Sequence, residues 1–324
     1  MIITKTPFRI SFCGGGSDIE DFYRENGGCV LSTSIDKYMY ISVHPFFDEN
    51  RISLKYSENE NVENSAEIRH SILRCVLQNM HIKGVEIVST ADVPSGTGLG
   101  SSSSFTVGLL HALYGFRGEC RSKAQLAEEA CDVEIKQLGA PIGKQDQYAA
   151  AFGGLNYITF RRNDEVQVEP LLVDRRILER LQDNLIMFYT GKRHDAGKIL
   201  TEQKKNLGDK RENLIRMCRL TGELRYSLEH GEIDLFGEIL DEGWRRKKEM
   251  ASSITGADID EMYQCAMKNG AAGGKLLGAG GGGFLLFYCE REKQNQLKEA
   301  LGLKQFQFRF EQDGSSIVYI GKWK

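Results

Sequence analysis

The glycines of this chain are gathered into a few short stretches. Of the 35 glycines in 324 residues, 20 lie in four windows that together span 50 residues, namely 14–28, 96–100, 139–154 and 270–283. Glycine adopts positive φ readily and lets the backbone approach a ligand or another segment closely. The excess therefore marks particular turns and loops of a fold and does not indicate a flexible chain.

Composition and charge restrict the class of protein. The chain has 41% hydrophobic and 27% charged residues and only 5 prolines, which excludes collagen-like and disordered classes. A formal net charge of −3 provides no overall positive field. We therefore expect no nucleic-acid or membrane partner, and an anionic ligand must be bound by a local site.

Targeting signals and metal patterns are not apparent in the sequence. No apolar run approaches the roughly 18–20 residues needed to span a membrane. The opening residues MIITKTPFRI read as a strand and not as a signal peptide, so we expect a cytoplasmic protein. The eight cysteines include no CxxC pair and the six histidines show no metal-binding spacing, which predicts reduced thiols and no transition metal held by the protein.

Apolar periodicity predicts an α+β protein. Alternation and β-branched residues indicate strands, whereas a 3.6-residue period indicates helices. We expect strands at 2–12, 27–45, 83–90, 155–160, 185–190 and 284–289 and a hairpin formed by FQFRF and SIVYI. We expect helices at 66–80, 122–138, 141–152, 196–230, 232–250, 258–270 and 292–302, and another that ends near Tyr114. A polar stretch at 170–182 places a domain boundary near residue 180, giving domains 1–180 and 181–324.

The most informative glycine window is PSGTGLGSSSS at residues 94–104, between a predicted strand and an apolar helix. Glycines let backbone N–H groups converge on a phosphate, the first-turn amides of a helix are unpaired, and serines add hydroxyl donors or a Mg²⁺ ligand. No lysine follows the last glycine, which excludes the GxxxxGK[ST] loop. We expect phosphate groups to bind Ser95, Gly96, Gly98, Gly100, Ser101, Ser102 and Ser103. A flexible Gly/Ser loop is the alternative.

The first window carries a run of three glycines in FCGGGSD. Gly14, Gly15 and Gly16 make a wall without side chains, against which a polyol can lie. Asp18 would accept hydrogen bonds from its hydroxyls, and Ser17 is included in the candidate sugar site. A plain turn capped by Asp18 is the alternative.

The remaining windows are more ambiguous. GAGGGG at 278–283 contains GxGxxG but precedes a strand, where a dinucleotide fingerprint needs a helix. The loop permits close approach to a ligand, with Gly281 as a sugar-side candidate, or to another loop. A purely structural hairpin is a further alternative.

The window at 139–154 and the helix before it carry two candidate acids. Glu134 and Asp146, 12 residues apart, can supply carboxylates to a metal and to a reacting hydroxyl. Two surface acids are the ordinary explanation, and this explanation is favoured when the pair is taken alone.

Three of these windows resemble the motifs of the GHMP small-molecule kinases, a family named for galactokinase, homoserine kinase, mevalonate kinase and phosphomevalonate kinase. TPFRISFCGGGSD looks like the first motif, PSGTGLGSSSSF like the phosphate loop, and KLLGAGGGGF like the third. The resemblance spans nearly the whole chain. It implies a two-domain fold, with an N-terminal ribosomal-protein-like α/β domain and a C-terminal ferredoxin-like α+β domain, and it implies ATP and Mg²⁺ as cofactors.

The resemblance also implies roles for single residues. Ser102 and Glu134 match the magnesium ligands of the family. Asp146 matches the acid that accepts the substrate proton, and Arg9 matches the basic residue that steadies Asp146 and the moving phosphoryl group. Asp18 matches a sugar-hydroxyl ligand.

The glycine loop at residues 14–18, here called the sugar loop, also indicates which substrate is bound. Gly15 and Gly16 stand where galactokinase has Glu and His. GGGSD is similar instead to the heptose 7-phosphate kinases of bacterial surface-glycan pathways and to fucose kinases, both of which phosphorylate an anomeric hydroxyl. The length resembles the heptose enzymes, which implies conversion of D-glycero-D-manno-heptose 7-phosphate to the 1,7-bisphosphate in GDP-heptose synthesis. A fucose-like or other hexose 1-kinase and a non-catalytic sugar and nucleotide sensor are the alternatives.

A phosphosugar needs a second anion site. The segment TGKRHDAGK at 190–198 carries four basic residues, and we take Arg193 as a phosphate ligand for its bidentate geometry, with Lys144 as another candidate. A solvated basic loop is the alternative. Tyr56, Ser57 and Glu58 are family-based candidates for the adenine site. The expected partners are the sugar phosphate and ATP, with a second copy of the chain as a further candidate.

Overall fold

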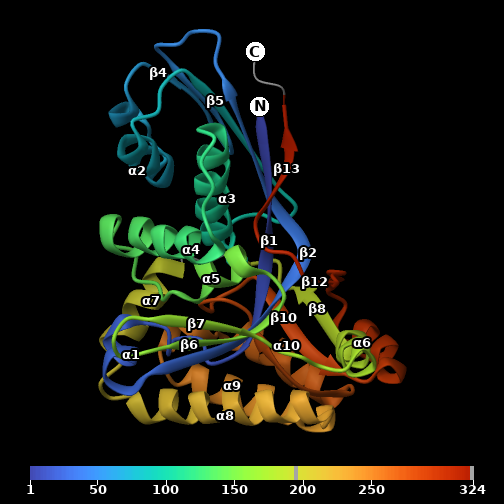
Figure 1. The fold of residues 1–324 in the computed structure, drawn as a ribbon. Coiled ribbons are helices and arrows are strands. Elements are labelled where there is room, and N and C mark those ends of the chain that lie inside the picture. The colour runs from blue at the N-terminus through green and yellow to red at the C-terminus, as the bar shows by residue number, and fades with distance from the viewer. Residues whose placement is uncertain (193–195, 322–324) are drawn as a thin grey trace.

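The strands of this protein form two sheets with helices packed on them. The computed structural model describes residues 1–192 and 196–321. In that part of the chain there are a nine-stranded sheet and a four-stranded sheet, covered and flanked by helices (Figure 1). The mixed content confirms the α+β class.

Two long strands run through the molecule from end to end. β1 (Ile2–Cys13) and β2 (Gly28–Pro45) pair antiparallel over nearly their whole length (Figure 1). One half of β2 also pairs with β5 (Val85–Ala91) and the other half with β6 (Leu155–Phe160). Both long strands are rich in β-branched and apolar residues that are buried, which is why they can extend this far.

Shorter strands complete both sheets. The large sheet also contains β3 (Ile52–Lys55), β4 (Asn59–Val62), β7 (Val166–Pro170), β12 (Phe310–Glu311) and β13 (Ser316–Ile320). The small antiparallel sheet has the order β11-β8-β10-β9, with bounds β8 (Leu185–Tyr189), β9 (Ala271–Leu276), β10 (Phe284–Cys289) and β11 (Lys304–Gln305).

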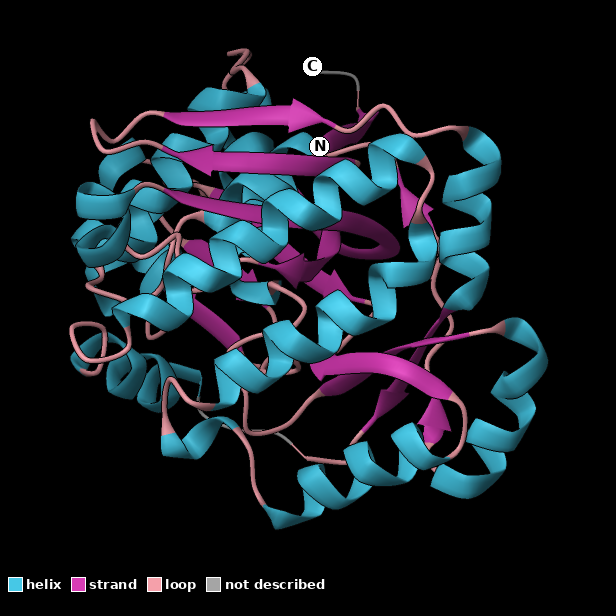
Figure 2. Ribbon diagram, turned by 90° about the horizontal axis from the view of Figure 1, so that it is seen from below, coloured by secondary structure: helices cyan, strands magenta, loops and turns pink. Residues whose placement is uncertain are grey.

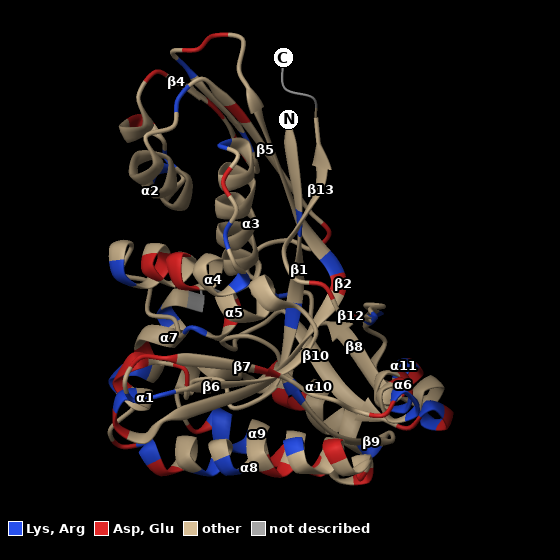
Figure 3. Cartoon of the chain, in the orientation of Figure 1, with Lys and Arg blue, Asp and Glu red and all other residues tan. Residues whose placement is uncertain are grey.

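The helices lie between these strands along the chain, either singly or several in succession. Their bounds are α1 (Glu20–Asn26), α2 (Ser71–Met80), α3 (Ser101–Phe116), α4 (Lys123–Cys131), α5 (Gln145–Phe152), α6 (Arg175–Asn184), α7 (Ala196–Lys205), α8 (Arg211–His230), α9 (Phe236–Lys248), α10 (Ala257–Lys268) and α11 (Gln294–Leu301). Viewed from below, α8 and α9 lie side by side (Figure 2), and α9 also packs on β9. They carry charges of both signs (Figure 3), whereas the sequence of α3, which packs on β1 and β2, has no Lys, Arg, Asp or Glu.

Two predicted helices are present at the expected positions, but one changes its helix type and the other begins later than predicted. Ser122 caps α4 through a capping box with Gln125, as its sequence indicates. The helix changes at Cys131 into a π-helical turn over residues 132–137. The helix predicted at 141–152 begins only at Gln145, because the preceding backbone bends to meet Asp18, which accepts a hydrogen bond from Gln145 N (3.1 Å).

Three other predictions were wrong. The helix at 196–230 is two helices, since residues 206–210 form turns around Gly208 and Asn206 Nδ2 donates to Met250 O (3.0 Å). FQFRF and SIVYI do not form a hairpin, because β12 pairs with β2 and β13 with β1. Strand β9 was missed because its sequence AAGGKL begins with four small residues. A Cβ at Gly273 would overlap the backbone of α9, so close helix packing requires the small residues.

The two sheets do not divide the chain at one point. β8 begins the small sheet after α6, but β12 and β13 return to the large one. The division into domains 1–180 and 181–324 stays a prediction.

Candidate active site

The phosphate loop ends at the N-terminus of α3. Gly96, Gly98 and Gly100 have φ values of +74°, +86° and +78°, so the turn that opens the helix depends on glycine. Ser104 N is the first amide to close a helical bond, to Gly100 O (3.0 Å). The N–H groups of residues 101–103 therefore remain available to an anion, at the positive end of a 16-residue helix.

The third glycine loop, residues 277–283, packs against the phosphate loop. A Cβ on Gly278 would overlap Gly98, and one on Gly283 would overlap the backbone of Thr97. The loop therefore makes the close approach to another loop that was one of its two predicted uses. Gly281 N donates to Ile254 O (2.8 Å), and Gly281 does not line the pocket next to the sugar loop.

A hydroxyl and a carboxylate meet beside the phosphate loop. Ser102 Oγ donates to Glu134 Oε1 (2.6 Å), and Gln147 Nε2 donates to Glu134 Oε2 (2.8 Å). The π-helical turn after α4 places Glu134 here, where it is buried, and burial raises the pKa of its carboxyl. Mg²⁺ takes oxygen ligands and commonly uses one or two protein groups plus substrate phosphates. Ser102 and Glu134 fit that requirement.

Arg9 and Asp146 form a bidentate ion pair beside this cluster. Arg9 Nε and Nη2 donate to the two carboxylate oxygens of Asp146, both at 2.7 Å, and Arg9 Nη1 donates to Gly98 O (2.8 Å). Arg9 lies on β1 and Asp146 in the first turn of α5. Both candidate catalytic residues are thus fixed against the phosphate loop.

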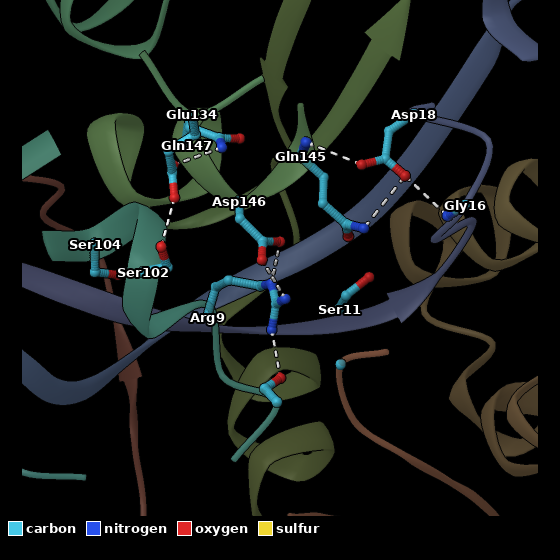
Figure 4. A network of polar contacts seen from close by, with 12 residues as sticks. Arg9, Ser11, Gly16, Asp18, Ser102, Ser104, Glu134, Gln145, Asp146 and Gln147 are labelled. Atoms are coloured by element: carbon cyan, nitrogen blue, oxygen red, sulfur yellow. Dashed lines mark hydrogen bonds and ion pairs between the residues drawn. The ribbon is translucent and has the colours of Figure 1, made fainter. Parts of the chain in front are cut away.

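Asp18 occupies the other side of the ion pair. It accepts hydrogen bonds from Gly16 N (2.8 Å), Gln145 N (3.1 Å) and Gln145 Nε2 (3.3 Å). Its burial raises the pKa of the carboxyl. A Cβ on Gly143 would overlap the Asp18 carboxylate, so this glycine of the 139–154 window permits the close contact between Asp18 and the start of α5. In Figure 4 the Arg9–Asp146 pair lies between Ser102 and Asp18.

A small polar pocket, of about 80 Å³, opens between these groups. Gly15, Gly16 and Asp18 of the sugar loop line it together with Arg9 and Asp146. The other two sugar-loop candidates do not line it. The backbone of Gly14 packs closely on Cys29 O, and Ser17 Oγ donates to the same carbonyl oxygen (3.0 Å).

A second pocket, of about 640 Å³, lies on the far side of the phosphate loop. Ser95, Gly96, Ser101 and Ser102 line one part of it, and the remainder includes Tyr56, Ser57, His70 and Phe105. Its size suits a nucleotide, and its lining includes two of the predicted adenine-site residues.

Lys144, one of the two predicted phosphate ligands of the substrate, is not brought into the small pocket. Lys144 Nζ is hydrogen-bonded to Asp164 and lies over the ring of Tyr23, 5.1 Å from its centroid. Lys144 is not among the residues that line the pocket. Arg193 lies outside the described residues.

Two basic pocket residues were missed from the sequence, Lys247 and Lys275. Both are buried, and both line the small pocket. Lys247 belongs to the run RRKK, which reads as a polar helix face. Its spacing from Leu240 and Trp244 puts it on the buried face of α9, which is the signal that identifies it.

Comparison with known proteins decides the family. The GHMP kinase N-terminal domain model matches residues 67–154, and the GHMP kinase C-terminal model matches residues 224–306. D-glycero-alpha-D-manno-heptose 7-phosphate kinase of Campylobacter jejuni is 30% identical over 318 residues, which cover 94% of each chain. The chain belongs to the GHMP kinase family. It has the two-domain α+β fold of that family, and it is an ATP-dependent phosphotransferase with an alcohol group as acceptor.

Further GHMP kinases show the same relationship. The bifunctional fucokinase/GDP-fucose pyrophosphorylase of Arabidopsis thaliana is 25% identical, over 92% of this chain and 31% of that protein. The crystal structure of a D-glycero-D-manno-heptose 1-phosphate kinase from Bacteroides thetaiotaomicron has a TM-score of 0.82 and 26% identity, and covers 99% of this chain and 100% of that one. In the described part of this GHMP kinase, none of the helices has the length and apolar character needed to span a bilayer.

Proposed function

We propose that this GHMP kinase is a sugar 1-kinase that transfers the γ-phosphate of ATP to the anomeric hydroxyl of D-glycero-D-manno-heptose 7-phosphate, as a step in GDP-heptose synthesis. The observation that carries the proposal is the Arg9–Asp146 pair, placed between the phosphate loop and the sugar-loop pocket. The heptose kinase relative, at 30% identity over 94% of both chains, supports the sugar.

Phosphoryl transfer depends mainly on positioning and on neutralising charge. The free amides at the start of α3 bind phosphate oxygens, and Arg9 places a positive charge beside the transferred group. Ser102 and Glu134 would hold Mg²⁺, which when bound neutralises charge on the phosphates.

The acceptor hydroxyl is oriented and deprotonated by the chain's own carboxylates. Arg9 fixes the Asp146 carboxylate through two hydrogen bonds, so that an oxygen of Asp146 accepts the hydroxyl proton. An anomeric hydroxyl is more acidic than an ordinary alcohol, which reduces the demand on this base. Asp18 binds the sugar hydroxyls.

The small pocket also offers unsatisfied polar atoms to such a ligand. Within the described residues, Ser11 Oγ and Gln145 Oε1 are buried without a hydrogen-bond partner, and both residues line the pocket. Buried polar atoms are nearly always paired, so these two favour a ligand rich in hydroxyl groups.

The proposal is tested by phosphorus NMR of the products formed with ATP and Mg²⁺ from heptose 7-phosphate, free heptose and L-fucose. We expect a new anomeric phosphate signal from heptose 7-phosphate, with the 7-phosphate signal retained. Turnover of L-fucose alone would favour the fucose-like kinase, and turnover of unphosphorylated sugars alone would refute the heptose 7-phosphate assignment. Nucleotide and sugar binding without any product would favour the sensor.

A further inference from the structure

Two lysines are buried in the wall of the small pocket without an acidic partner. The exposed fractions are 8% for Lys247 and 5% for Lys275. Lys247 Nζ donates to Gly278 O, and Lys275 Nζ donates to Ser11 O (2.7 Å) and Phe12 O (2.9 Å). An ammonium group has three N–H donors, so Lys247 has two further donors and Lys275 one.

The carboxylates of the pocket are already engaged elsewhere. Both oxygens of Asp146 accept hydrogen bonds from Arg9, and Asp18 is held by Gln145 and the backbone of Gly16. Among the described residues, neither lysine forms an ion pair with an acid. Asp18 and Asp146 attract Lys247 only from a distance, so the two buried ammonium groups have no direct acidic partner in the pocket.

Burial of these cations is costly without a counter-charge. Burial lowers the pKa of Lys247 to about 7, helped by the neighbouring charges of Lys275 and Arg9, and it lowers the pKa of Lys275 to about 8. A cation in such a position is stabilised when an anion binds beside it. The C-terminal end of α9, where Lys247 lies, is the favourable end of a helix for a positive charge.

The lysines belong to the acceptor side of the site. They line the pocket that contains Asp18 and the sugar loop, whereas Ser95, Gly96, Ser101 and Ser102 of the phosphate loop line the other pocket. Ser11, whose free hydroxyl faces the same pocket, lies on β1 next to the carbonyl groups that hold Lys275. An anionic group of the acceptor would thus meet an ammonium group and a hydroxyl together.

We propose that Lys247, supported by Lys275, binds the phosphate ester of the acceptor sugar and makes the site select a phosphorylated sugar over a free one. This inference rests on the proposed function. The phosphoryl group transferred from ATP has the same charged oxygen atoms as the phosphate ester of the sugar and would also bind a lysine. The test therefore has to distinguish these two phosphates. Lys144, with its ammonium group on Asp164, is the rival that this assignment replaces.

The test compares Lys247→Met with a neighbouring control. Methionine keeps the apolar stem of the buried side chain and removes its charge. Lys248→Gln is the matched control, because Lys248 is the next residue on α9 and pairs with Asp260 (3.0 Å) outside the pocket. Dissociation constants for heptose 7-phosphate and free heptose are measured by titration calorimetry, and kcat is measured by ADP release.

We expect Lys247→Met to raise the dissociation constant of heptose 7-phosphate by about 10- to 100-fold, the contribution of one hydrogen bond between charged groups. The dissociation constant of free heptose and kcat at saturation should stay within about threefold of the parent values, and Lys248→Gln should match the parent throughout. A fall in kcat with unchanged affinity would assign Lys247 to the transferred phosphoryl group and overturn the inference, as would equal losses for both sugars.

Folding is checked by the melting temperature. If Lys247→Met does not fold, Lys247→Gln is measured in its place, because it also removes the charge. A loss of affinity confined to heptose 7-phosphate supports the inference, and unchanged affinity overturns it. Failure of the proposed function would appear separately, as absence of heptose 7-phosphate turnover by the parent enzyme.

Discussion

Replacement of Asp146 by asparagine separates the chemistry of the site from its stability. Asparagine has one acceptor oxygen, so Asp146→Asn loses one of the two 2.7 Å hydrogen bonds from Arg9 and turns an amide donor toward the guanidinium. A hydrogen bond to a charged group contributes about 1.5–3 kcal/mol. Because the Asp146 side chain is 24% exposed, we expect the lower part of that range, and a fall in Tm of about 2–8 °C.

Loss of activity should be much larger than this loss of stability explains. Without a proton acceptor, kcat should fall by about 10²- to 10⁴-fold, although nearly all of the protein is still folded at 25 °C. The ATP dissociation constant should stay within about threefold, because the α3 amides and Ser102 are unchanged. ADP release, calorimetric ATP titration and thermal melting measure the three quantities.

The matched control is Asp183→Asn, which removes the acid from an exposed pair with Arg291 (3.5 Å). Exposed pairs contribute at most about 1 kcal/mol, so this variant should keep its activity and its Tm. A kcat within about threefold of the parent for Asp146→Asn would refute its role as proton acceptor. Loss of ATP binding would instead show that Asp146 supports the phosphate loop.

Three further variants test other parts of the site. Gly98→Ala should lower Tm by about 2–8 °C and weaken ATP binding, because its Cβ would overlap the third glycine loop. Gly118→Ala is the control, since Gly118 has a similar positive φ (+73°) but nothing within 4 Å of an added Cβ, and it should change Tm alone. Normal ATP binding by Gly98→Ala would show that the contact between the two loops is not needed for the ATP site. Glu134→Gln should raise the Mg²⁺ concentration for half-maximal rate by about tenfold or more, and an unchanged Mg²⁺ titration would remove Glu134 from the metal site. Lys144→Gln should leave the KM for heptose 7-phosphate within about twofold, since Lys144 is tied to Asp164, whereas a tenfold rise would restore it as a phosphate ligand.

Local motifs were predictable because each depends on neighbouring residues. The turn at residues 96–100 and the helix after it follow from glycine, serine and apolar spacing, and the structure has both. The approach of Glu134 to Ser102 was expected only from the family resemblance. The geometry that achieves it, a π-helical turn, had no signature in the sequence.

Long-range contacts could not be predicted in the same way. The burial of Lys247 follows from its spacing on α9, but its place in the pocket does not, because the sugar loop and the loop at residues 277–283 are remote from it in sequence. The contact between Gly143 and Asp18 likewise depends on the tertiary fold. The short strands β12 and β13 look like a hairpin locally, but the unpaired edges of β1 and β2 are stronger partners for them.

The pairing of β13 with β1 has a consequence for folding during synthesis. Ile2 pairs with Ile320, and Ser315 Oγ lies 2.9 Å from Thr6 Oγ1 and 3.0 Å from His111 Nδ1. While the ribosome is still making the preceding residues, this edge of β1 and the polar groups beneath it have no native partner. The high sequence separation slows completion of the sheet and exposes β1 to wrong pairing. The large sheet, which carries Arg9 on β1, therefore reaches its finished state only after residues 316–320 have been translated.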